Sequence, residues 1–383
     1  MKVLKSFAIL CLGALLVGCN PDNGGKNNEG LVLHADKNYI YNNGGATPDG
    51  VLTFTVTYNG QVLNGGYEIY EDDVNLLEGN TFTSEVIKTY RFYAIYGAEQ
   101  SNELRINVMK TPPPAPAVPV DANPSKLNFA RRVLLLQFTG TGCQYCPGMV
   151  NALIDMNEAT HYETQEYLYK DQIAIAAAHI GSYAGSDPAL LEDAPTLDDA
   201  FGIVSYPSLI IDMVPGNVNP SYAAVSAATD KALARTTAKA GIAVNAAYHA
   251  EDMFVVINTL VKASQTEEFR IGAWLLEDGI VGAQSMNAAI EKKEGVNYNI
   301  HNNCIRRANS KQGIKDFTGL NLGTIKSGET KSMEFSFPLK ANWKSENLHL
   351  LVFVSTKDEK GKWYVNNVVK APINGTTDFV YAE

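Results

Sequence analysis

Cys143 and Cys146 are the residues whose types and spacing most clearly indicate chemistry. Two residues separate them, so their sulfurs can meet across one helical turn. The apolar run 133–138 predicts a buried strand before them, and residues 147–157 predict a helix after them. Cys143 would then lie at a helix start, where unpaired backbone N–H groups favour a thiolate. We expect thiol–disulfide exchange in which an exposed Cys143 attacks and a more buried Cys146 resolves the mixed disulfide.

A proline, Pro207, follows Tyr206 directly before another apolar run. With the cysteine pair, this arrangement resembles the thioredoxin superfamily over about residues 127–240. The resemblance implies that Cys143 is the nucleophile, that Cys146 is the resolving thiol, and that the Tyr206–Pro207 bond is cis. It also implies that the backbone at Tyr206 and Pro207 binds an extended partner peptide.

Two residues depart from the thioredoxin pattern. Gln137 occupies the strand position where thioredoxins have a buried acid, and a Gln side chain cannot accept the resolving proton. Gly142 stands where thioredoxins have a Trp. These departures predict slow turnover as a general reductase.

Two other residues near the pair have alternative roles. His179 ends a predicted buried strand, where it either tunes the thiolate as a proton acceptor or caps the strand with a hydrogen bond. Tyr145, between the cysteines, either contacts a partner peptide or shields the disulfide.

The elements that must position these residues follow an α/β order within a longer β-rich chain. Residues 164–170 and 223–240 predict further helices, and residues 173–179 and 208–212 predict buried strands. We therefore expect a multidomain α/β plus β protein of 383 residues. Its predicted parts are a lipoprotein signal peptide (1–18), a flexible tether (19–30), an immunoglobulin-like β-sandwich (31–110), a Pro-rich linker (111–126), a central thioredoxin-like domain (127–240) and a C-terminal β-sandwich (241–383).

The N-terminal residues predict export and a lipid anchor. Lys2 and Lys5 precede a short apolar run, which ends in a Leu-Val-Gly-Cys sequence at Cys19. This sequence resembles a lipobox, in which the Cys is lipidated after cleavage. We expect a cell-envelope protein attached through Cys19 to the outer membrane, on its periplasmic or its surface face.

Composition narrows the classes of partner. The formal net charge of −10, without a basic cluster, argues against nucleic-acid binding. We expect partners among exported protein thiols or cell-envelope proteins.

Cys304 is either a redox partner of the pair or a buried free thiol. His residues lack metal-ligand spacing, so we expect neither a metal site nor a cofactor.

Three stretches resemble the outer membrane protein twenty-eight family of Bacteroidetes lipoproteins: residues 134–147, 274–280 and 298–306. The resemblance covers about residues 127–383. It implies an outer-membrane lipoprotein with a thioredoxin-like fold followed by a β domain.

The sequence leaves open whether the pair is catalytic and, if so, whether it acts as a reductase, oxidase or isomerase. The alternative is a non-enzymatic surface protein for adhesion or assembly, in which Cys143–Cys146 is a structural disulfide.

Overall fold

The computed structural model describes residues 30–36, 39–42, 51–181, 183–192, 194–308 and 317–382. The predicted signal peptide, Cys19 and all of the tether before residue 30 lie outside these ranges. Strands make up 43% of the described residues and helices 10%. In the described ranges, no helix has both the length and the apolar character needed to cross a bilayer.

The described residues form two compact units. The first comprises residues 30–36, 53–82 and 90–105, and the second contains the short stretches 39–42, 51–52 and 83–89 together with everything from residue 106 onward. Strands of the N-terminal region are β1 (Leu31–Ala35), β2 (Tyr39–Asn42), β3 (Leu52–Tyr58), β4 (Gln61–Val62), β5 (Glu68–Glu71), β6 (Asn75–Leu76), β7 (Thr81–Phe82), β8 (Thr89–Tyr96), β9 (Glu99–Gln100) and β10 (Leu104–Lys110). Residues 31–110 are thus strand-rich as expected, while their immunoglobulin-like classification stays a prediction.

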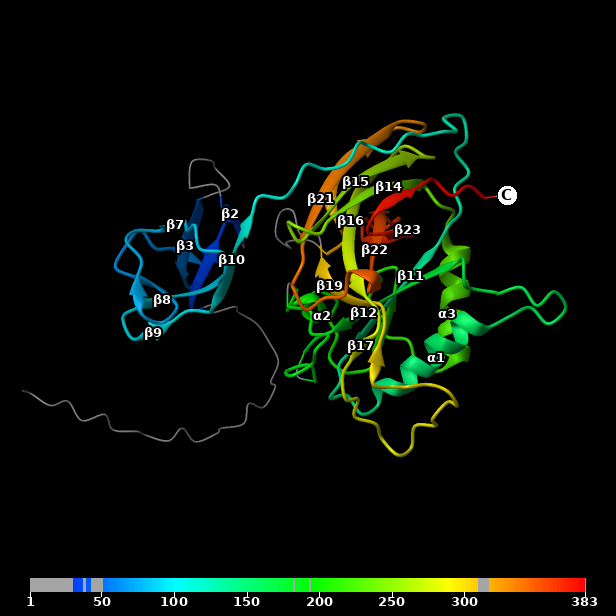
Figure 1. The fold of residues 1–383 in the computed structure, drawn as a ribbon, viewed down its shortest axis with the longest axis horizontal. Helices are drawn as coiled ribbons and strands as arrows, with labels where there is room; N and C mark the ends of the chain where they lie inside the picture. The colour runs from blue at the N-terminus through cyan, green and yellow to red at the C-terminus, as the bar shows by residue number, and fades with distance from the viewer. Residues whose placement is uncertain are drawn as a thin grey trace, which may run out of the picture. The chain divides into compact units, whose positions relative to one another are not determined.

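The larger unit is built on an eight-stranded sheet (Figure 1). Its strands are β13 (Ser208–Ile211), β11 (Val133–Thr139), β12 (Ile173–His179), β19 (Cys304–Ala308), β16 (Glu267–Glu277), β22 (Leu348–Lys357) and β23 (Trp363–Pro372) in spatial order, with β20 (Leu320–Ile325) also paired to β16. A four-stranded sheet contains β21 (Thr330–Pro338), β15 (Phe254–Ala263), β14 (Ala240–His249) and β24 (Gly375–Thr377). A small ribbon pairs β17 (Ile280–Val281) with β18 (Ile300–His301).

The expected fold class is wrong at its centre, because residues 127–240 do not form a separate α/β thioredoxin-like domain. Their strand β12 pairs in parallel with β19, where Ala177 lies opposite Cys304. In addition, the Val365 N–H of β23, the last strand in this order, donates to the carbonyl of Asp212, which follows the first strand, β13. One sheet therefore contains strands from both predicted domains. The predicted boundaries at residues 110, 126 and 240 stay predictions.

Helices cover only one part of this sheet. α1 (Cys146–Glu158) and α3 (Tyr222–Arg235) contact each other and pack on β11 and β13, while α2 (Leu197–Ala200) is a single turn (Figure 1). Alternate residues of β11 face opposite sides: Val133 and Leu135 contact the helices, while Leu134 and Leu136 contact the core formed with the C-terminal strands. The expected helix at 164–170 is absent, since these residues form turns, bends and an isolated bridge of Tyr167 to Thr160.

Two buried charged residues, Asp212 and Lys262, connect separate segments of the larger unit. Asp212 accepts hydrogen bonds from Arg131 and Arg235, each at 2.7 Å. Burial raises the pKa of Asp212, and the two guanidinium groups oppose this shift. The second buried charge, Lys262 on β15, donates to Asp121 at 2.7 Å and to two carbonyls of residues 123–124. The Pro-rich segment thus contacts the four-stranded sheet that contains β15.

Candidate functional site

Cys143 and Cys146 form a disulfide with a Cα–Cα distance of 5.4 Å. Cys146 is the first residue of α1, Pro147 follows in its first turn, and Cys143 lies in the preceding turn. Proline suits this position because the first helical N–H groups lack intrahelical partners. The pair is therefore at the helix start, as its spacing predicts.

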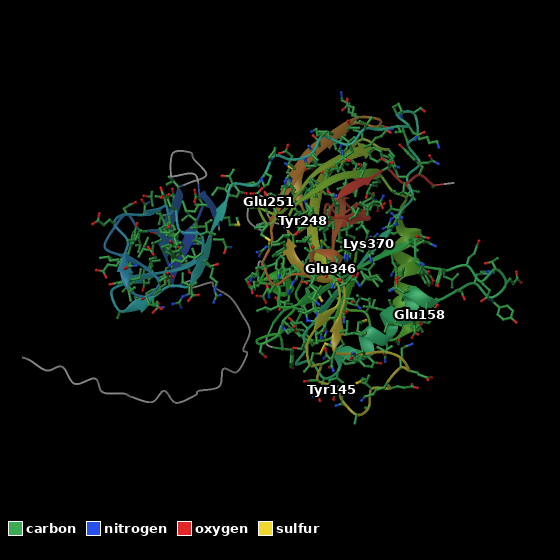
Figure 2. All side chains as sticks on the ribbon, viewed as in Figure 1. Tyr145, Glu158, Tyr248, Glu251, Glu346 and Lys370 are labelled. Atoms are coloured by element: carbon green, nitrogen blue, oxygen red, sulfur yellow. A yellow bond between two sulfur atoms is a disulfide. The ribbon has the colours of Figure 1, made fainter. Side chains whose placement is uncertain are left out.

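The disulfide is buried, contrary to the expectation of an exposed Cys143. Cys143 is 3% exposed and Cys146 is 1% exposed. The residue between them, Tyr145, is 49% exposed and lies near the N-terminal end of α1, opposite the end marked by Glu158 (Figure 2). An approaching protein would meet Tyr145 before it met either sulfur.

The turn before the disulfide requires glycines. Gly142 N–H donates to the Tyr183 carbonyl at 3.0 Å. A Cβ added at Gly142 would lie 2.9 Å from that oxygen, and one added at Gly140 would lie 2.7 Å from it. A large side chain at residue 142 is thus excluded by the close approach of the Tyr183 backbone.

Residues 282–293, which we call the covering segment, pass over the disulfide turn. Gln284 donates through Nε2 to the carbonyls of Thr141 (3.1 Å) and Cys143 (2.9 Å). The backbone N–H groups of Ser285 and Asn287 donate to Thr141 and Gln144 carbonyls at 2.7 and 2.8 Å. The covering segment therefore runs alongside the disulfide turn, joined to it by backbone hydrogen bonds, and limits access to the sulfurs.

The covering segment is also attached to α1. Lys293 forms an ion pair with Asp155, and Asn151 donates to the Glu291 carbonyl at 2.8 Å. Tyr298 follows the segment and donates to Asn151 Oδ1 at 2.6 Å. These contacts lie on two successive turns of α1, so the covering segment is held at several points.

His179 is part of a buried pair that supports the same turn. Its Nδ1 lies 2.7 Å from Asp187 Oδ2, which also accepts from the Thr141 N–H at 2.7 Å. Burial alone would raise the pKa of Asp187, but the hydrogen bonds from His179 and the backbone lower it to about 2. The His301 ring lies 5.0 Å from the His179 ring, and burial lowers its pKa.

Tyr206 and Pro207 lie beside the end of β11, because Ser208 pairs with Phe138. Their peptide bond is cis, as expected. The Tyr206 hydroxyl donates to Asp198 at 2.5 Å, and its ring contacts the Tyr183 ring. Burial, followed by this hydrogen bond, raises the pKa of Tyr206. Both residues are half-buried. Their role in binding a partner peptide stays a prediction.

Gln137 lines a cavity of about 370 Å³ between α1 and the sheet. His179, His301 and Gln284 also line it, so the cavity adjoins the disulfide turn. Cys304 is buried, and burial raises the pKa of its thiol well above the usual range. In the described part of the chain, no three His, Cys, Asp or Glu residues gather as metal ligands.

Asp187, Gln284 and His301 are the site residues that the sequence did not identify. Asp187 and Gln284 lie in loops outside any recognisable motif. His301 lies on β18, within the stretch 298–306 that resembles the outer membrane protein family. Only the tertiary fold brings these side chains to the disulfide turn, so their positions in the sequence gave no local signal of this role.

The family model of outer membrane protein Omp28 matches residues 194–377. This match places the protein in the cell envelope, at the outer membrane. A search of curated proteins gives no match.

Among solved structures, the chain is similar to HBP35 of Porphyromonas gingivalis, with a TM-score of 0.51 and 17% identity over 67% of this chain and 81% of that chain. This likeness concerns the fold alone. Spo0M, a sporulation control protein of Bacillus subtilis, has a TM-score of 0.22 and 13% identity over 38% of this chain and 50% of that chain.

Proposed function

We propose that the protein is a lipid-anchored envelope protein that exchanges disulfides with thiols of other exported proteins through Cys143 and Cys146. The observation that carries the proposal is the bonded pair at the start of α1, with a sequence separation of 3. In the chain-entropy account, a disulfide that closes so short a loop stabilises a fold by only about 2 kcal/mol. This value is at the low end of the range for disulfides, which favours a chemical role for the bond over a purely stabilising one.

The exchange reaction balances as two displacements. A partner thiolate attacks Cys143 Sγ and forms a mixed disulfide, while Cys146 leaves as a thiolate at the helix start. A second thiolate of the partner then attacks the partner sulfur and releases Cys143. The partner is oxidised by two electrons and the pair is reduced, and the reverse sequence reduces a partner disulfide.

Access to Cys143 requires the covering segment to move. Gln284 and the backbone of Ser285 occupy the acceptor groups of the turn that carries the disulfide. Tyr145 and Tyr183, both about half exposed, provide apolar surface at that turn for a partner. Docking of an unfolded or extended partner would compete with the covering segment for this position.

The anchor belongs to the same proposal. Lipidation of Cys19 would tether the folded units to the outer membrane through the polar stretch that follows it. Mass spectrometry of the protein purified from membranes tests this part, since an unmodified Cys19 would contradict it.

A second candidate is a non-enzymatic adhesion or assembly protein with a structural disulfide. The burial of both sulfurs favours it, because thiol exchange needs an accessible sulfur atom. Gln137 also favours it, since this side chain cannot accept a proton from the resolving thiol.

A redox titration separates the two candidates. For an exchange protein we expect a reduction potential between about −120 and −270 mV and measurable reduction of insulin disulfides. Cys143→Ser abolishes this activity. The matched control is Cys304→Ser, which removes the buried third thiol and leaves the rate unchanged.

A potential below about −300 mV together with no activity would instead establish a structural bond. Loss of activity in the Cys304→Ser control, with the fold intact by circular dichroism, would also contradict the assignment of exchange to the Cys143–Cys146 pair.

A further inference from the structure

The cavity between α1 and the sheet is a second candidate site, independent of disulfide chemistry. Its volume of about 370 Å³ falls within the range of small-molecule pockets. On the helix side it is lined by Pro147, Val150 and Ile154, which recur at helical spacing. Ile175 and Ile300 add apolar surface from the opposite side. An apolar chain or ring could lie along this wall.

The sheet side provides one polar group that lacks a partner in the described part of the chain. Gln137 is 4% exposed, yet its Nε2 has no hydrogen-bond partner among the described residues. A buried amide donor left unpaired costs about 1–3 kcal/mol, so a native fold rarely retains one without use. Since Gln137 lines the cavity, a bound acceptor such as a carbonyl oxygen would satisfy it.

Two histidines supply the complementary acceptors. His301 Nε2 lies 3.1 Å from the Gly282 carbonyl, which can only accept, so this nitrogen carries the proton. The Nδ1 atom of the neutral ring is then an acceptor. His179 Nδ1 is engaged by Asp187 in the same way, which leaves Nε2 as the atom that remains for a ligand.

The lining carries no strong charge. Within the described part of the chain, neither Lys, Arg, Asp nor Glu lines the cavity, while six Asn and Gln side chains do: Gln137, Asn157, Gln284, Asn297, Asn302 and Asn303. A charged ligand would lose its hydration without gaining a partner of opposite charge. The lining therefore disfavours anions and cations.

We infer that this cavity binds an uncharged amphipathic small molecule with an apolar chain or ring and a carboxamide-like end. The apolar part contacts Val150 and Ile154 of α1. The polar end accepts from Gln137 Nε2 and donates to a histidine nitrogen. The site is distinct from the disulfide, so it can be occupied in the oxidised protein.

Three probes that differ only at the head group test the inference: octanamide, octanoate and octylammonium. Binding to the oxidised full chain is measured by ligand-observed NMR and by thermal shift. We expect octanamide to bind at least tenfold more tightly than either ion, because only the neutral head matches the lining.

Variants then locate the site. Val150→Phe fills the space beside α1 and should abolish binding, while Val74→Phe, at a residue 77% exposed in the first unit, should leave it unchanged. Gln137→Leu replaces the amide by an apolar side chain of similar size and should weaken octanamide binding about tenfold while sparing the weaker ions. If Val150→Phe does not fold, the Gln137→Leu result decides alone.

The inference is overturned if octanamide does not bind, if all three probes bind equally, or if Gln137→Leu leaves the preference for octanamide intact. Binding that survives in a folded Val150→Phe variant would also overturn it.

Discussion

At the scale of single residues, Asp187 connects three parts of the site. Oδ2 accepts from His179 and from the Thr141 N–H, and Oδ1 accepts from the Ala189 N–H at 2.8 Å. One carboxylate thus holds the end of β12, the turn before the disulfide and the loop that follows β12. Such a group stabilises the fold only while it is ionised.

Replacing Asp187 by Asn should therefore lower stability in a pH-dependent way. The pKa of Asp187 is about 2 in the fold and about 3.8 when unfolded, so its contribution is complete above the unfolded value and is lost as the pH falls toward 2. We expect Asp187→Asn to lower the free energy of unfolding at pH 7 by about 2 kcal/mol. Denaturant unfolding measures this loss.

At pH 2.5 the difference between wild type and Asp187→Asn should shrink. Asp171→Asn, at an exposed residue, serves as the control and should change stability little at either pH. An equal loss at both pH values would show that the carboxylate charge contributes nothing.

At the scale of elements, the covering segment determines how quickly the disulfide can react. Gln284 links it to the turn through hydrogen bonds to Thr141 and Cys143. Removing them should raise the population of open states, since each bond contributes about 1 kcal/mol.

We expect Gln284→Ala to speed reduction of the disulfide by dithiothreitol about tenfold, measured by thiol trapping. Gln172→Ala is the matched control, because Gln172 also donates through Nε2 to a carbonyl, that of Leu168, but away from the disulfide turn. A rate unchanged by Gln284→Ala would mean that the covering segment does not limit access.

The sequence predicted where helices and strands lie better than it predicted which strands pair with each other. Residues 173–179 are a strand with the predicted bounds, and the helix after the cysteines begins at Cys146. Apolar periodicity reports which residues are buried, but it carries no information on which strand lies alongside. The pairing of Ala177 with Cys304 was therefore invisible, and the central segment was wrongly taken for a separate domain. For the same reason the cover over Cys143 was missed.

At the scale of the larger unit, Lys262 attaches the Pro-rich segment to the second sheet. Its side chain is 1% exposed, and its ammonium group donates to Asp121 and two backbone carbonyls. Burial would raise the pKa of Asp121, but the hydrogen bond from Lys262 leaves it lowered. Breaking a buried pair costs about 3–5 kcal/mol, whereas an exposed pair is worth about 0–1 kcal/mol.

Lys262→Met should consequently release residues 116–124 and expose them to proteases. We expect faster cleavage between residues 111 and 126 in limited proteolysis, located by mass spectrometry. Lys357→Met, which removes an exposed pair with Glu268, should leave the cleavage pattern as it is. Equal protection in both variants would show that the segment is held by other contacts.

The pairing of β12 with β19 also constrains how the protein is made. β12 is complete more than a hundred residues before β19 emerges, so a nascent or translocating chain presents an unpaired strand edge in the meantime. Pairing partners so distant in sequence slow folding and prolong this exposure. During export, this edge would need shielding by chaperones until β19 is available to pair with it.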